Sequence, residues 1–137
     1  MVKIVNQKIR QKIRKRRSSL VKGTGERPRV VFSESNRYLR VQAIDDTIGH
    51  TLVAASTENF TAKDGEKLEQ IGTENTGQVN KNYSRKNKVY AKKLGEVFAT
   101  KLKKVSKEKI VFDRNARPYQ GKMKIFCETM RHCGINF

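Results

Sequence analysis

The feature that most constrains the fold is a run of three short segments with strand character between residues 29 and 57. They read "RVVFS", "RYLRVQAI" and "HTLVAAST", and the turn-rich stretches "ESN" and "DDTIG" separate them. Strands joined by such short turns are typical of an antiparallel meander. The folded part of the chain is therefore expected to begin with three neighbouring strands of one sheet.

The second segment shows the period of two that a half-buried strand requires. Its apolar positions are Leu39, Val41 and Ala43. The alternate positions form a largely polar and aromatic set, which is Tyr38, Arg40, Gln42 and Ile44. One face of the sheet is thus predicted to pack on a core, and the other face to be available for contact.

Apolar side chains follow the helical period of about 3.6 residues in two later segments. The first runs from about Ser84, a candidate N-cap, to about Lys104, and the second ends at Gly134. Between them, "KIVF" at residues 109–112 is expected to form a fourth strand. The periodic positions are Tyr90, Leu94, Val97, Phe98, Leu102 and Val105 in the first helix and Met123, Phe126, Met130 and Cys133 in the second.

This order of elements predicts an α/β fold of the α+β kind. The sheet is expected to be small and mixed, a three-strand meander plus one further strand, with two main helices on its apolar face. A length of 137 residues favours one domain with its own core. We therefore expect a basic arm at residues 1–26 and a single globular domain at residues 27–137, with a long surface loop at about residues 58–84.

The first seventeen residues contain eight Lys or Arg and no acid. Such a block repels itself, so it is expected to stay disordered until a polyanion binds it, and then to form an amphipathic helix. A cleaved organelle-targeting peptide is the alternative, because that class is also basic and free of acids. The basic residues of the arm are Lys3, Lys8, Arg10, Lys12, Arg14, Lys15, Arg16 and Arg17.

The charge of the whole chain points to a polyanionic partner. The formal net charge is +18, and nucleic acid neutralises such a charge most readily, with an anionic membrane surface as the second candidate. No apolar stretch approaches the ~20 residues that span a bilayer. Cys127 and Cys133 lie six residues apart, on different faces of a helix, so neither a disulfide nor a zinc site between them is expected.

Enzymatic chemistry has little support in the sequence. A metal-dependent nuclease needs several converging acids, and Asp113 at a strand end with Asp45 and Asp46 is the candidate set. Asp45 and Asp46, however, lie in a turn, where acids more often form the turn itself. His50 and His132 lie in no nucleophile motif or metal-ligand spacing. We therefore expect no catalysis, no cofactor, no metal and no small-molecule substrate.

The stretch "KIVFDRNARPYQGK" at residues 109–122 allows two roles. In the first, Asp113 orients Arg114 or caps the turn, and Pro118 fixes the chain before the helix. In the second, the loop contacts RNA through guanidinium and aromatic planes. The candidate contact residues of the loop are Arg114, Arg117, Tyr119 and Lys122.

Three blocks, "FSESNRYLRVQAIDD", "GHTLVAAST" and "VFDRNARPYQGKMKIFCETMRHCGINF", resemble the bacterial-type ribosomal protein eighteen family of the large subunit. The resemblance implies an α/β fold with a basic arm and no catalysis. It further implies that the protein binds 5S ribosomal RNA and helps to seat it on the large-subunit RNA, beside neighbouring proteins of the central protuberance. The location implied is the ribosome of a bacterium or of an organelle of bacterial descent, with no membrane partner.

The resemblance also assigns residues to the RNA-facing surface. These are Ser35, Asn36, Arg37, Tyr38 and Gln42, and we add Arg29 and Arg40 as candidates. The chain departs from the family pattern at Ser33 and Glu34, where Arg is usual, at Arg40, where Tyr is usual, and in the longer stretch from Glu58 to Arg85. The alternatives are a general RNA- or DNA-binding protein, a nuclease and a membrane-surface binder.

Overall fold

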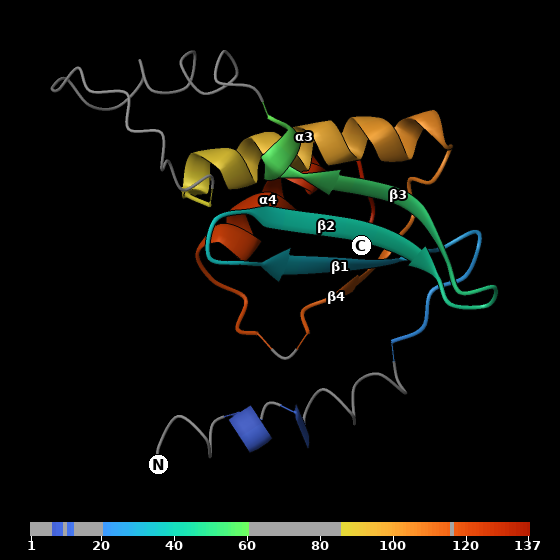
Figure 1. Ribbon diagram of the computed structural model, residues 1–137. Helices are drawn as coiled ribbons and strands as arrows, with labels where there is room; N and C mark the ends of the chain where they lie inside the picture. The colour runs from blue at the N-terminus through green and yellow to red at the C-terminus, as the bar shows by residue number, and fades with distance from the viewer. Residues whose placement is uncertain (1–6, 10, 13–20, 61–85, 116) are drawn as a thin grey trace, which may run out of the picture.

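A four-stranded sheet in the order β3-β2-β1-β4 forms the centre of the computed structural model (Figure 1). The structure describes residues 7–9, 11–12, 21–60, 86–115 and 117–137. β1 (Arg29–Glu34), β2 (Leu39–Asp45) and β3 (His50–Ser56) pair antiparallel, and β4 (Val111–Asp113) pairs parallel with β1. The predicted meander and the mixed sheet are confirmed. β4 begins two residues later than predicted, because Lys109 forms a bridge to Asn136 instead.

The two faces of the sheet differ as the alternation predicts. Leu39, Val41 and Ala43 are fully buried, whereas Arg40 and Gln42 on the same strand are exposed. The pairing of β2 with β3 shifts after Ala43, and the bulge at this shift leaves one residue of β3 without an opposite partner. The face that carries Arg40 and Gln42 is called the open face below.

Two helices cover the buried face of the sheet (Figure 1). α3 (Lys88–Lys104) begins after Asn87, whose side chain accepts a hydrogen bond from the Tyr90 amide at 3.0 Å. The cap is therefore Asn87 and not the predicted Ser84, which lies outside the described residues. α4 (Lys122–His132) packs closely on α3, since a Cβ at Gly95 would lie 3.0 Å from the Cβ of Thr129.

Phe126 of α4 joins the helices to the sheet. Its ring centroid lies 5.1 Å from that of Phe32 on β1, and 6.2 Å from those of Phe98 on α3 and Phe112 on β4. The sheet and both helices therefore share one aromatic cluster. After β3 the chain forms a short 3-10 helix, η1 (Thr57–Asn59), and Phe60 is buried. The rest of the predicted long loop, from residue 61 onward, lies outside the described residues.

An arginine with two carboxylate partners holds one end of the sheet together. Arg29 on β1 donates to Asp46, in the turn between β2 and β3, at 2.7 and 2.8 Å, and to Asp113 of β4 at 3.2 Å. Asp46 also accepts a hydrogen bond from the Gly23 amide at 2.7 Å. A Cβ at Gly23 would lie 2.3 Å from the Arg29 amide nitrogen, so only glycine fits there. The arm therefore leaves the domain from a fixed point.

The Arg29 guanidinium lowers the pKa of Asp46 from its usual 3.8 to about 2, and the Gly23 amide adds to the shift. Because the pKa in the folded state lies below that in the unfolded state, the pair stabilises the fold fully above pH 3.8. This stabilisation is lost as the pH falls toward 2. Solvent screens the pair, so we expect a contribution of about 1 kcal/mol.

We expect Asp46→Asn to lower the free energy of unfolding by about 1 kcal/mol at neutral pH, because the amide cannot hold Arg29 as an ion pair. The parent should lose this difference between about pH 4 and pH 2, and the variant should not. Urea unfolding at several pH values measures both effects. Glu96→Gln is the matched control, since Glu96 is exposed on α3 and its side chain pairs with no described residue. Parallel curves for the parent and Asp46→Asn would contradict the assignment.

Candidate nucleic-acid interface

The predicted contact residues of the sheet lie on the open face and on the turn that follows β1. Arg40 lies opposite Ser33 on β1, and Gln42 lies opposite Val31. Arg40 donates to Glu58 at 3.1 Å, and about half of its side chain is exposed. This carboxylate holds the guanidinium over the open face, while Gln42 is exposed beside it.

The turn between β1 and β2 is closed by its own side chains. The Ser35 hydroxyl donates to the Tyr38 carbonyl oxygen at 3.0 Å and accepts from the Tyr38 amide at 3.0 Å. Asn36 and Arg37 form the exposed tip of the turn. Among the described residues, none forms an ion pair or a hydrogen bond with the Arg37 side chain. The turn therefore presents an unpaired cation on a rigid backbone.

The loop after β4 lies at the same end of the sheet, because β4 runs parallel to β1. Asp113 caps this loop, accepting a hydrogen bond from the Asn115 amide at 2.8 Å. The same carboxylate pairs with Arg29, so the predicted capping role is confirmed, whereas the alternative in which it orients Arg114 is wrong. Arg114 is exposed, and within the described part of the chain its side chain has no ion-pair partner.

Glu34 links the end of β1 to the loop and to α4. It forms an ion pair with Lys122 and a second one with Arg117 at 3.7 Å. The departure from the family pattern at Glu34 thus has a structural role, since it brings together two predicted contact residues. A groove of about 510 Å³ lies here, and it is lined in part by Ser35, Asn36, Arg117 and Lys122.

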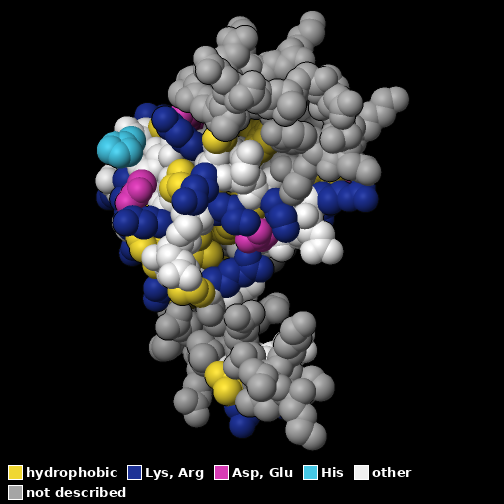
Figure 2. Space-filling model, turned by 90° about the vertical axis from the view of Figure 1, so that its left-hand side faces the viewer, with side chains coloured by type: hydrophobic (Ala, Val, Ile, Leu, Met, Phe, Trp, Pro, Cys, Tyr) yellow, Lys and Arg dark blue, Asp and Glu magenta, His cyan; other side chains and the backbone are white. Residues whose placement is uncertain are grey.

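Figure 2 views the molecule from the end of the sheet where this turn lies. Lys and Arg side chains are spread over the visible face, and few acidic side chains lie among them. A surface of this kind favours a polyanionic partner. The candidate residues of the turn and the loop therefore lie in a positive environment.

Tyr119 does not line this groove. Its hydroxyl accepts a hydrogen bond from Arg131 of α4 at 3.0 Å, and its ring lines a separate cavity beside Phe137. Sequence analysis did not select Arg131, Phe137 or Arg27, which also line that cavity. The sequence did contain a signal for this site. Two aromatic residues, Phe112 of β4 and Tyr119 of the loop, precede α4, and Arg131 lies in the last turn of that helix.

The arm is described only in part. Residues 7–9 and 11–12 have helical backbone, and the predicted contact residues Lys8 and Lys12 among them are exposed. The other predicted contact residues of the arm, which lie outside the described residues, are Lys3, Arg10, Arg14, Lys15, Arg16 and Arg17. That the arm forms an amphipathic helix on a bound polyanion stays a prediction.

The three acids that the nuclease hypothesis requires, Asp45, Asp46 and Asp113, form hydrogen bonds and ion pairs within the fold. Asp45 accepts hydrogen bonds from the Thr47 hydroxyl and from the Thr47 amide, which lower its pKa. Asp46 and Asp113 are both paired with Arg29. In the described part of the chain no cluster of His, Cys, Asp and Glu is suited to a metal ion. The carboxylates therefore act as structural partners here.

The two cysteines form no disulfide with each other. Cys127 and Cys133 are free thiols, and burial raises the pKa of Cys127 to about 12, which makes it unreactive at neutral pH. Cys133 is half-buried.

None of the described helices has the length and the apolarity that a membrane crossing requires.

Comparisons with known proteins identify the family. The family model described as ribosomal L18 of archaea, bacteria, mitochondria and chloroplast matches residues 3–137. The large ribosomal subunit protein uL18 of Petrotoga mobilis is 37% identical over 138 residues, which cover 100% of both chains. The uL18 proteins of Borrelia duttonii and Leptospira biflexa are 39% and 40% identical over 114 residues, which cover 83% of this chain and 79% and 80% of theirs. The chain therefore belongs to the ribosomal L18 family, whose members are structural proteins of the ribosome and not enzymes.

Proposed function

We propose that this protein, a structural constituent of the large ribosomal subunit, binds 5S ribosomal RNA and helps to attach it to the large-subunit RNA in the central protuberance. The observation that carries the proposal is the pair of loops at one end of the sheet. There Arg37 and Arg114 are exposed and have no partner among the described side chains, while the neighbouring cations are fixed by carboxylates.

This arrangement suits the recognition of structured RNA. Phosphate contacts set the position of a protein on a duplex, and they require cations whose spacing is fixed by the fold. Arg40 and Lys122 are each held in place by a carboxylate and stay partly exposed, whereas Arg29 is neutralised by Asp46 and Asp113 and serves the fold. No described carboxylate pairs with Arg37 or Arg114, so both guanidinium groups are available to contact phosphate.

The arm supplies affinity without sequence preference. It carries eight cations in seventeen residues, and each phosphate neutralised contributes ~0.7 to 0.9 to the slope of log affinity against log salt. The arm leaves the domain at Gly23, beside Arg29 and the turn between β2 and β3. This is the end of the sheet opposite the turn at Arg37. A protein with contacts at both ends is suited to join two RNA segments.

The remaining alternative is a basic protein that binds any nucleic acid. Charge alone would explain such binding, whereas the pattern of fixed and unpaired cations around two capped loops would have no role in it. A reader of RNA shape discriminates between folded RNAs at the same charge. Competition between two structured RNAs therefore separates the two functions.

We expect 5S ribosomal RNA to remain bound to the full chain in about 150 mM salt when a large excess of transfer RNA is added, because a reader of RNA shape discriminates between RNAs that charge alone would bind equally. Filter binding or fluorescence anisotropy with labelled 5S RNA measures the competition. A duplex DNA competitor gives the third arm of the experiment. Complete displacement by transfer RNA would mean that the charge accounts for the affinity, and the proposed function would be rejected.

We expect Arg37→Ala and Arg114→Ala each to weaken 5S RNA binding about tenfold and to lower the salt slope by about one, because each removes one phosphate contact. Neither should change the melting temperature, since both side chains are exposed and unpaired within the described part of the chain. Lys104→Ala on α3 is the control, as it removes one exposed charge away from both loops. Equal losses for all three variants would contradict the specific role of the loops.

A further inference from the structure

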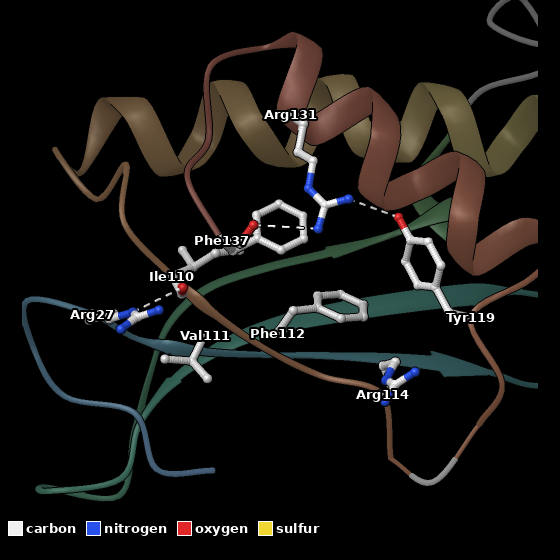
Figure 3. A pocket seen from close by; sticks show the side chains of 8 residues that line it. All are labelled: Arg27, Ile110, Val111, Phe112, Arg114, Tyr119, Arg131 and Phe137. Carbon is white, nitrogen blue, oxygen red and sulfur yellow. Dashed lines mark hydrogen bonds between the residues drawn. The ribbon is translucent and has the colours of Figure 1, made fainter.

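A cavity of about 350 Å³ lies along the free edge of β4, between this strand, α4 and the last residues of the chain (Figure 3). Arginines and aromatic rings form most of its lining, and no acidic side chain among the described residues takes part. The lining residues are Arg27, Ile110, Val111, Phe112, Arg114, Tyr119, Arg131 and Phe137. This chemistry differs from that of the groove beside Glu34.

Planar groups in mutual contact form the inner wall of the cavity. The rings of Phe112 and Phe137 have centroids 5.7 Å apart, and the Arg131 guanidinium lies 4.5 Å from the Phe137 centroid. Arg131 also donates to the Tyr119 hydroxyl at 3.0 Å and to the Phe137 carbonyl oxygen at 3.4 Å (Figure 3). Two hydrogen bonds and one ring contact thus fix the plane of this guanidinium between two aromatic side chains.

The backbone of β4 offers a donor and an acceptor at the same place. The Val111 amide donates to the Pro28 carbonyl oxygen at 3.0 Å, on the side of β1. Along a strand in parallel pairing, the backbone groups of successive residues point to opposite sides. The N–H and C=O of Phe112 therefore point away from β1, toward the free edge that borders the cavity. A base that lies flat in the cavity meets one donor and one acceptor there.

Cations lie at the rim. Arg114 is exposed and unpaired among the described residues, and Arg27 is held by a hydrogen bond of 3.2 Å from its Nε atom to the Ile110 carbonyl oxygen. The two Nη groups of Arg27 are not part of that bond. Both guanidinium groups are thus placed to contact phosphates on either side of a seated base.

We propose that this cavity receives one unpaired base of the bound RNA, an inference that rests on the proposed function and adds a base-binding site to it. The base stacks on the plane formed by Arg131 and the aromatic rings, its edge meets the backbone of Phe112, and Arg114 and Arg27 contact the flanking phosphates. Stacking on aromatic and guanidinium planes is the usual way in which proteins bind splayed-out RNA bases. The described lining contains no acidic side chain, which favours this anionic partner over a peptide.

The first test uses adenosine 5′-monophosphate as the probe and the full chain in NMR titrations at millimolar nucleotide. We expect saturable shifts of the Tyr119, Phe137 and Arg131 side-chain resonances, and we expect Arg131→Met to abolish them. Inorganic phosphate is the matched probe, since it carries the charge without the base. Equal shifts with phosphate and with the nucleotide, or shifts that spare these three side chains, would overturn the proposal.

The second test uses 5S ribosomal RNA with single abasic substitutions at its unpaired positions. One such substitution should weaken binding of the parent about 5- to 100-fold, as expected for the loss of one stacked base. Arg131→Met should show a loss of the same size on intact RNA and no further loss on that abasic RNA. Absence of any abasic position that is coupled to Arg131 in this way would overturn the proposal.

Controls keep the two tests independent of folding, of charge and of the proposed function. Lys124→Met removes the same charge from an exposed position of the same helix, and we expect less than a threefold loss of RNA affinity from it. Tyr119→Phe removes only the hydroxyl that anchors Arg131. It replaces Arg131→Met in both tests if that variant melts at a lower temperature than the parent. We expect Tyr119→Phe to weaken RNA binding more than Lys124→Met does. If transfer RNA displaces 5S RNA from the parent, the proposed function fails, while the nucleotide titration still decides whether the cavity binds a base.

Discussion

Carboxylates are scarce in this chain, with 13 Asp and Glu against 31 Lys and Arg, and the arrangement of its cations depends on where they lie. Asp46 and Asp113 share Arg29, so one guanidinium joins β1, the turn after β2 and β4. Glu34 does the same for the loop and α4 at the opposite end of β1. Each acid thus fixes elements that the net charge would otherwise push apart. Arg37 and Arg114, which no described carboxylate pairs, are exposed in the loops at one end of the sheet.

Local periodicity predicted most of the fold, but it could not predict which side chains distant in sequence pair with each other. The alternation of Leu39, Val41 and Ala43 placed the strand and its buried face correctly, because both follow from backbone geometry. Asp113 shows where this reasoning ends. Its neighbour Arg114 looked like a partner, but successive residues of a strand point to opposite sides, and the acid pairs with Arg29, 84 residues away. Only the register of β1 with β4 brings these two together.

The candidate site was predictable to a similar extent. Sequence analysis selected Arg114 and Tyr119 from their loop, and both line the cavity at β4. It did not select Arg131, because the helical pattern was used to find the apolar face of α4 and the polar positions were left aside. It also missed Phe137, since the bridge between Lys109 and Asn136, which returns the chain to β4, joins residues far apart in sequence. Side chains that meet through tertiary pairing leave little local signal.

The position of Arg114 connects the two kinds of recognition that the structure supports. This residue belongs to the loop that Asp113 caps, and it also lines the cavity whose wall is the stack on Arg131. A phosphate bound at Arg114 would therefore lie next to a base seated in the cavity. Glu34 holds the other end of the same loop through Lys122. Because carboxylates hold the loop at both ends, the backbone at Arg114 has a defined position relative to the stacking plane. Such a defined position of a phosphate contact relative to a base site favours one RNA conformation over others of equal charge.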